Sequence, residues 1–308
     1  MLTLDQITEL FFLVDEYCIH FENNIQNCLT KLPSANQKLT RNKPSSMSSS
    51  EVITIMIAFH QSDFRTLKHF YKEYVCQHLT KEFPAFVSYN RFVELQKSAA
   101  LPMILFVSSN CLGDCTGFSF IDSTKLAVCK NQRIHQHKQF KDIAQRGHTS
   151  TGWFYGFKLH LIINDKAEII SFQLTKGNVS DNNENLLLKL CQDIFGKLYG
   201  DKGYLVKQSV FEKLFHDGVH LITKIKKNMK NKLMSIHDKI MLRKRSVIEC
   251  VMDSLKNICQ LEHSRHRSLH GFINNIFAAI AAYHYLPKKP SITSQFEMNP
   301  NNFIQLSL

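Results

Sequence analysis

Three acidic residues lie where a carboxylate could take part in chemistry. Asp122 ends a strand-like apolar run at residues 117–122, and Asp201 ends a second run at residues 197–201. Glu249 lies in a helical pattern, four residues after Arg245. Carboxylates on separate elements can together hold two metal ions, and two ions about 3.5–4 Å apart clamp the attacking and leaving oxygens of a phosphodiester. These residues therefore predict phosphodiester chemistry on a nucleic acid.

The oxygen ligands of this candidate site suit hard divalent cations. We expect two Mg²⁺ ions, for which Mn²⁺ can substitute, and no other cofactor. Asp122 is expected to bridge the ions, Asp201 to bind the ion that activates the nucleophile, and Glu249 to complete the other ion's site. Asp253, one helical turn after Glu249, competes for the third position. One aspartate after a strand is more often a turn or cap residue, so the combination of three carries the prediction.

The composition indicates a folded protein with a polyanionic partner. The chain has 308 residues, a net charge of +12 and 44% hydrophobic residues, which excludes a disordered chain and favours binding to nucleic acid. The nine cysteines include no C-x-x-C pair, and Cys111 and Cys115 lack a second pair to complete a zinc site. We expect a reducing, cytoplasmic and nucleoid-associated location, with no membrane segment.

The order of the predicted elements indicates the fold class. The first 112 residues are mainly helical, and the patterns there cover residues 4–19, 52–59, 64–75, 89–99 and 101–112. A polar linker is expected at residues 33–50, and Ser48 and Glu51 form a capping box before the second helix. The later pattern is β-β-β-α-β-α-β-α, with strands at residues 118–121, 155–163, 167–174, 198–200 and 219–225 and helices at residues 181–195, 209–215, 242–260 and 268–285. A basic stretch at residues 130–146 reads as a loop.

Three antiparallel strands followed by αβαβα describe a ribonuclease H-like (RNase H-like) α/β fold. We predict a mixed five-stranded sheet with flanking helices, preceded by the helical domain. The first strand and the strand ending at Asp201 should lie side by side, which places Asp122 and Asp201 in the crevice where open α/β sheets bind ligands. The predicted domains are residues 1–112 (DNA-end binding), 113–290 (catalytic) and 291–308 (a tail).

Several basic or aromatic residues are candidates for binding DNA near the acidic site. They are Lys202, Tyr204, Arg245, Lys256, Arg265 and Arg267. Arg245, Glu249 and Lys256 are spaced by four and seven residues, so we expect them to share one face of a helix. The alternative is a solvated helix face with a simple ion pair. His263, His266 and His270 have metal-ligand spacing, but a phosphate-binding or structural role is favoured beside two arginines.

Five sequence blocks together resemble the DDE transposases of bacterial insertion sequences. They contain Asp122, residues 147–160, residues 175–178, the Gly-Asp-Lys-Gly-Tyr run at 200–204, and Arg245-x3-Glu249-x6-Lys256. In related groups the last block begins with Tyr-x2-Arg, whereas this chain has Leu242 at the Tyr position. The resemblance covers residues 118–286. It implies an RNase H-like fold, Asp122, Asp201 and Glu249 as metal ligands, and Mg²⁺-dependent cutting and rejoining of double-stranded DNA at terminal inverted repeats.

The resemblance implies element ends and target DNA as partners, with a homodimer on paired ends. Two alternatives remain: an RNase H-like nuclease that does not transpose, and a transposase-derived DNA-binding regulator. The three intact carboxylates disfavour the regulator. Lys256 and the basic helical domain favour transposition over simple cleavage.

Overall fold

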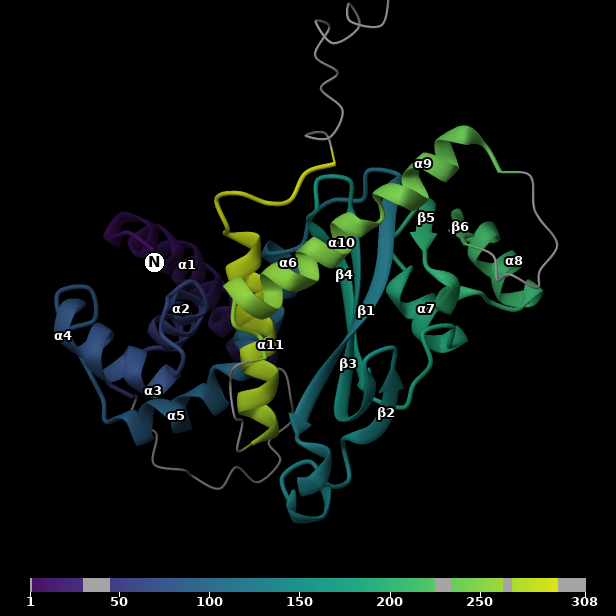
Figure 1. The fold of residues 1–308 in the computed structure, drawn as a ribbon. Helices are drawn as coiled ribbons and strands as arrows, with labels where there is room; N and C mark the ends of the chain where they lie inside the picture. The colour runs from purple at the N-terminus through teal and green to yellow at the C-terminus, as the bar shows by residue number, and fades with distance from the viewer. Residues whose placement is uncertain (1, 30–44, 225–233, 263–267, 293–308) are drawn as a thin grey trace, which may run out of the picture. The chain divides into compact units, whose positions relative to one another are not determined.

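The computed structural model describes residues 2–29, 45–224, 234–262 and 268–292. The chain forms two compact units, a helical unit of Met1–Cys111 with Ser254–Leu286 and a second unit containing Leu112–Asp253 (Figure 1). The change at residues 111–112 lies where the sequence predicts the end of the helical domain. Ser254–Leu286, predicted to lie with the sheet, instead belongs to the helical unit. The predicted linker at residues 33–50 and the tail at 291–308 lie largely outside the described residues.

The helical unit is built around two helices that are buried on most of their faces. They are α2 (Ser49–His60) and α11 (Leu269–His284). The remaining helices are α1 (Leu4–Leu29), α3 (Leu67–His69), α4 (Cys76–His78), α5 (Tyr89–Ser98) and α6 (Ala100–Asn110), with π-helical turns at Phe70–Val75 and Ser254–Ile258. The capping box at the start of α2 is confirmed, because Ser48 Oγ accepts from Glu51 N at 3.1 Å and Glu51 accepts from Ser48 N at 2.6 Å.

Two predicted helices are wrong in detail because π turns interrupt them. The pattern at residues 64–75 predicts one helix, but the structure has α3, a π-helical segment and α4. Residues 242–260 likewise divide into the end of α9 (Ile236–Lys244), α10 (Ser246–Asp253) and the π-helical Ser254–Ile258. Apolar spacing alone does not distinguish these windings over one or two turns.

The second unit contains a mixed sheet of six strands. They are β1 (Phe118–Cys129), β2 (Gln145–Thr149), β3 (Gly152–Asn164), β4 (Ile169–Lys176), β5 (Gly196–Gly200) and β6 (Val219–Thr223). β3 is antiparallel to β1, while β1, β5 and β6 are parallel neighbours. β2 pairs with residues 152–156 of β3, and β4 pairs with residues 157–163. β2 and β4 therefore lie end to end along one edge of β3, and β1 pairs with the other edge. The sheet is five strands wide.

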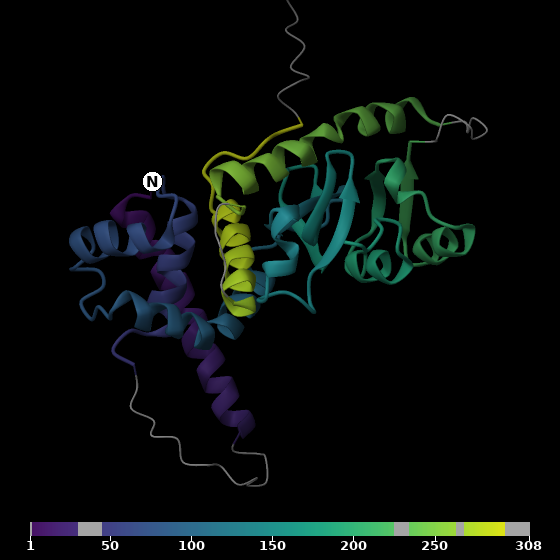
Figure 2. The ribbon, with the colours of Figure 1, turned by 60° about the horizontal axis from the view of Figure 1, so that its bottom comes forward.

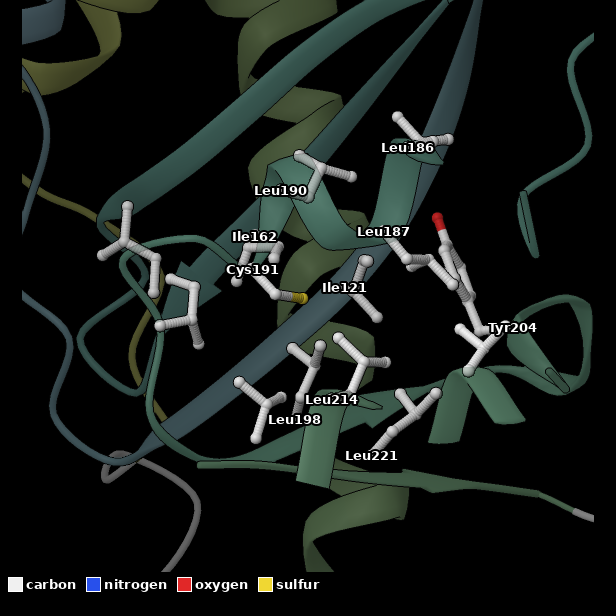
Figure 3. Close-up of a cluster of buried hydrophobic side chains, with 14 residues drawn as sticks. Ile121, Ile162, Leu186, Leu187, Leu190, Cys191, Leu198, Tyr204, Leu214 and Leu221 are labelled. Carbon is white, nitrogen blue, oxygen red and sulfur yellow. The ribbon is translucent and has the colours of Figure 1, made fainter. Parts of the chain in front are cut away.

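Alternation along the strands divides the core into two faces. Ile121 and Leu198 contribute to a buried cluster with α7 (Glu184–Leu190) and α8 (Gln208–His216), shown in Figure 3. Phe120 and Tyr199 lie on the other face, where their rings are 5.7 Å apart. Figure 2 shows α9 and α10 running along the sheet on the side away from α7 and α8.

The strand order β4-β3-β1-β5-β6 confirms the predicted RNase H-like mixed sheet with flanking helices and a helical N-terminal region. The main departure is the stretch predicted as a loop at residues 130–146, which contains a 3-10 helix, Asn131–Gln136, and the start of β2. Among the described helices, none has the length and apolar character that crossing a membrane requires.

Candidate active site

Asp122 and Asp201 lie close together on two neighbouring parallel strands, Asp122 within β1 and Asp201 directly after the end of β5. The sequence predicts that the first strand ends at Asp122, but β1 continues to Cys129. β1 and β5 are parallel, with Phe120 paired to Tyr199. Asp122 follows Phe120 by two residues, and Asp201 follows Tyr199 by two residues. The register itself therefore brings the two carboxylates close together at the centre of the sheet. This juxtaposition is the one that the element order predicts.

A tight turn orients Asp201. Its side chain caps the 3-10 turn Lys202–Tyr204, and Oδ1 accepts a hydrogen bond from Gly203 N at 2.8 Å. A Cβ added at Gly203 would lie 2.9 Å from the same oxygen. A side chain at position 203 would therefore push the Asp201 carboxylate out of this orientation, which glycine leaves undisturbed.

The guanidinium of Arg245 joins Asp122 to Glu249. Arg245 Nη1 donates to Asp122 Oδ2 at 2.7 Å, and Nη2 donates to Glu249 Oε1 at 2.9 Å. The arginine side chain is 13% exposed, whereas that of Glu249 is 60% exposed. Arg245 therefore acts as a largely buried countercharge between two of the three predicted carboxylates.

Burial and pairing act in opposite directions on this ion pair. Burial raises the pKa of Asp122, although the Arg245 charge and the Ser123 N–H group partly offset that effect. Burial lowers the pKa of Arg245, but the charges of Asp122, Glu249 and Asp201 and the hydrogen bond to Asp122 together outweigh it, so the net shift of the Arg245 pKa is upward. The Arg245 cation therefore favours the ionised form of Asp122.

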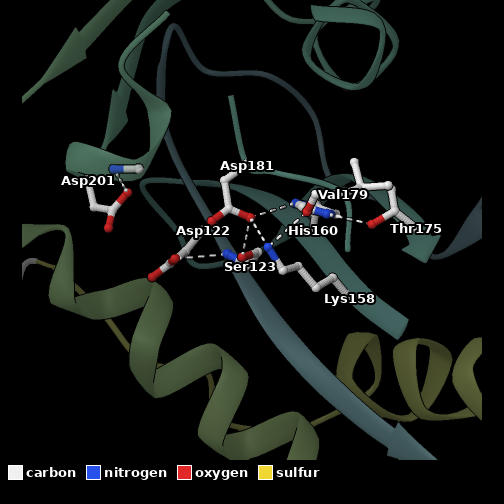
Figure 4. A network of polar contacts seen from close by, with 9 residues as sticks. Asp122, Ser123, Lys158, His160, Thr175, Val179, Asp181 and Asp201 are labelled. Atoms are coloured by element: carbon white, nitrogen blue, oxygen red, sulfur yellow. Dashed lines mark hydrogen bonds and ion pairs between the residues drawn. The ribbon is translucent and has the colours of Figure 1, made fainter. Parts of the chain in front are cut away.

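A second polar network lies behind Asp122, on the opposite face of β1 (Figure 4). Ser123 Oγ donates to Asp181 Oδ1 at 2.9 Å, and Lys158 Nζ donates to the same oxygen at 3.1 Å. His160 lies 3.8 Å from that oxygen through Nδ1, and its Nε2 contacts Thr175 Oγ1 at 3.0 Å. Burial lowers the pKa of His160 to about 4, so the imidazole is neutral at pH 7.

Sequence reasoning missed this network. The available signal was the pair of polar residues at alternate positions of a predicted strand, Lys158 and His160, which places both on one face. Asp181 had no such signal, because it lies between β4 and α7 and reaches the site only through the fold.

The predicted DNA-binding residues occupy different environments. Lys202 is exposed beside Asp201. Tyr204 is 1% exposed within the cluster of Figure 3, so the prediction that it contacts DNA requires correction in favour of a packing role. Arg245 is held by carboxylates, and Arg265 and Arg267 lie outside the described residues.

Lys256 belongs to the helical unit and pairs with Glu262 at 2.7 Å. The prediction that Arg245, Glu249 and Lys256 share one face assumed an uninterrupted α-helix. The π-helical winding from Ser254 changes that spacing. Glu249 is linked to Asp122 through Arg245, and Asp253 is exposed at the end of α10.

Within the described residues, no three His, Cys, Asp or Glu side chains lie close enough together to hold one metal ion. The three carboxylates are instead arranged around Arg245, whose pKa is influenced by Asp122, Glu249 and Asp201. In this conformation the arginine provides the positive charge between them.

The strand order, with Asp122 on β1 beside Asp201 at the end of β5, places this unit in the RNase H-like class. A family model described as the transposase DDE domain matches residues 112–269, which is more than half of the chain. The chain therefore belongs to the DDE-domain transposases. No curated protein matches the chain. Family membership gives it a transposase-type function with DNA as the substrate.

Proposed function

We propose that this protein cleaves DNA at the terminal inverted repeats of an insertion sequence and transfers the freed strand to a target. The observation that carries the proposal is the parallel register of β1 and β5, which brings Asp122 and Asp201 together, with Glu249 tied to Asp122 through Arg245. Family membership supplies the reaction class.

The donor set fits divalent cations such as Mg²⁺. Asp122, Asp201 and Glu249 offer oxygen ligands, and the Arg245 guanidinium among them shows that the site accommodates positive charge. When bound, two such ions stabilise the charge that develops on the attacking and leaving oxygens. If metal took the two carboxylate oxygens that Arg245 contacts, the guanidinium would be free to bind a DNA phosphate.

The chain's own residues prepare the two aspartates for this chemistry. Ser123 N donates to Asp122 Oδ1 at 2.8 Å, and Gly203 N donates to Asp201 Oδ1 at 2.8 Å. Each backbone donor fixes one oxygen, and the second oxygen of Asp122 accepts from Arg245. Lys202, exposed beside Asp201, is positioned to meet a phosphate.

We also infer that the helical segment of residues 1–112 binds the element ends. A catalytic sheet contacts the shape and the phosphates of DNA, and such contacts give little sequence specificity. The net charge of +12 supports a DNA partner. A homodimer on paired ends and a nucleoid-associated cytoplasmic location belong to the same proposal.

A cleavage and strand-transfer assay tests the function. Labelled DNA carrying candidate element ends is incubated with the protein, a target plasmid and Mg²⁺. Wild type should nick the ends and join them to the plasmid, whereas Asp122→Asn and Asp201→Asn should do neither while remaining folded. Asp165→Asn, a change at an exposed aspartate that accepts from Thr116, is the matched control and should retain activity.

The products also separate the two alternatives. Nicked ends without joined product would identify a nuclease that does not transpose. End binding by wild type without cleavage would identify a DNA-binding regulator. Normal cleavage by a folded Asp122→Asn or Asp201→Asn variant would overturn the assignment of the site.

A further inference from the structure

We propose that Asp181 is a positioning residue of this active site, whose carboxylate braces the two residues that orient Asp122 and Asp201. The inference rests on the proposed function, because it assigns Asp181 a role toward the same two aspartates. It is carried by the hydrogen bonds of Asp181 Oδ1 and by the place of Oδ2 beside Gly203.

The first oxygen braces the residue next to Asp122. Ser123 N fixes Asp122 Oδ1, and the Ser123 side chain donates to Asp181 Oδ1 on the opposite face of β1. Ser123 is thus held from both sides. A shift of Asp181 would be transmitted through this one residue to the Asp122 carboxylate.

The second oxygen faces the turn that orients Asp201. A Cβ added at Gly203 would lie 3.5 Å from Asp181 Oδ2 and 2.9 Å from Asp201 Oδ1. Gly203 therefore lies between the two carboxylates. The same backbone unit donates its N–H to Asp201, so Asp181 Oδ2 lies beside the group that sets the direction of Asp201.

Lys158 holds Asp181 in place. Its Nζ donates to Asp181 Oδ1 at 3.1 Å and to Val179 O at 2.9 Å, and its side chain is 9% exposed. A buried ammonium on a central strand has little freedom, so its contacts fix both the carboxylate and the chain segment that carries it. Figure 4 shows Asp181 between Lys158 on one side and Asp122 and Asp201 on the other.

The simpler alternative is that Lys158 and Asp181 form only a structural ion pair. The chain provides a matched pair for comparison. Lys197 Nζ contacts Asp238 Oδ1 at 2.8 Å, and Asp238, 12% exposed, also accepts from Tyr199 and Ser235. That pair joins β5 to α9, and these hydrogen bonds connect it to Tyr199 and Ser235 rather than to Asp122 or Asp201. The loss of Asp238 therefore measures how destabilisation alone affects metal affinity.

The experiment measures metal binding directly. Mn²⁺ affinity of the DNA-free protein is determined by electron paramagnetic resonance for wild type, Asp181→Ala, Asp238→Asn and Asp122→Asn, with thermal melting beside it. Loss of a residue that orients metal ligands typically weakens affinity roughly 10- to 100-fold. We expect Asp181→Ala to fall in that range and to need correspondingly more Mg²⁺ for half-maximal cleavage. Asp238→Asn should lower the melting temperature without changing Mn²⁺ affinity.

A double variant keeps the test decisive if Asp181→Ala is unstable. Removing the unpaired lysine as well, in Lys158→Met/Asp181→Ala, should recover stability but not Mn²⁺ affinity. Recovery of affinity along with stability, or an equal loss in Asp238→Asn, would overturn the positioning role. An Asp122→Asn variant that binds Mn²⁺ like wild type would instead overturn the proposed metal site, and the inference with it.

Discussion

Arg245 should compete with metal ions for Asp122 and Glu249. The guanidinium contacts one oxygen of each carboxylate, at 2.7 and 2.9 Å. Replacing it with the neutral Arg245→Gln removes the only countercharge that the structure shows between them. We therefore expect the variant to be less stable than wild type without metal, and to gain more stability when metal is added.

The expected loss follows from the exposure of each partner. Glu249 is 60% exposed, so its pair with Arg245 contributes under about 1 kcal/mol. Asp122 is 21% exposed, and a hydrogen bond to a charged group is worth about 1.5–3 kcal/mol. A total near 2 kcal/mol lowers the melting temperature by about 4–8 °C for a unit of this size. If metal must displace the guanidinium, removing it tightens metal binding by roughly 30-fold.

Thermal melting in EDTA and across a Mg²⁺ titration measures both effects. Wild type and Arg245→Gln should differ in EDTA and converge at saturating Mg²⁺, because metal then replaces the lost charge. Arg91→Gln, which removes an exposed pair with Glu94 at 2.8 Å, is the matched control and should change neither curve. An Arg245→Gln variant whose Mg²⁺ response equals that of wild type would refute the idea that the arginine and the metal share these carboxylates.

Four further predictions concern the third carboxylate, the helical unit and its binding. Glu249→Gln should abolish cleavage but retain binding of element ends in a gel-shift assay, whereas Asp253→Asn should retain both, and the reverse pattern would move the third ligand by one turn. Burial lowers the pKa of His60 from 6.5 to about 4. As the pH falls, His60 is therefore protonated in the unfolded chain before it is protonated in the folded chain. Urea unfolding should show that the free energy of unfolding falls by at most about 3 kcal/mol from pH 6.5 to pH 4. His60→Asn should remove this loss. Ser48→Ala breaks the capping box of α2 and should cost about 1 kcal/mol in the same unfolding assay. End binding should weaken steeply with salt, and a linear log–log plot with a slope near zero would count against phosphate contacts.

The sequence pattern was sufficient for the sheet and for the pair of aspartates at its centre. Period-two alternation and apolar runs predict the strands, and their order fixes which two are parallel neighbours. Because the predicted apolar runs at residues 118–121 and 198–200 are each followed by an aspartate, their parallel pairing places Asp122 beside Asp201 even though β1 itself continues to Cys129. No side-chain detail was needed for that step.

The partners of those aspartates could not be predicted in the same way. Arg245 looked like a phosphate-binding residue, since its spacing to Glu249 does not show that it also reaches β1, 123 residues away in sequence. Asp181 lies between elements, where no periodicity constrains a side chain. Both assignments depend on contacts between segments far apart in the chain.

The placement of α11 also depended on long-range contacts. Its apolar pattern indicates burial without indicating against which partner. In the structure, Asn274 Nδ2 donates to Gln96 O at 2.6 Å and Asn275 Nδ2 donates to Leu261 O at 3.2 Å. These buried amides would be costly to leave without partners, so they favour one arrangement with the other helices of that unit.

The two faces of β1 show how the chain keeps acidic groups in a partly buried site. Asp122 and Ser123 are adjacent, so they point to opposite faces, and each face has its own cation. Arg245 contacts Asp122 directly, while Lys158 acts through Asp181 on Ser123. Lys158 also donates to the Val179 carbonyl, whereas Arg245 donates to Asp122 and Glu249, the carboxylates that metal would take over. We therefore expect the two cations to behave differently: Arg245 exchanges with metal and is released toward DNA, and Lys158 stays in place throughout the reaction.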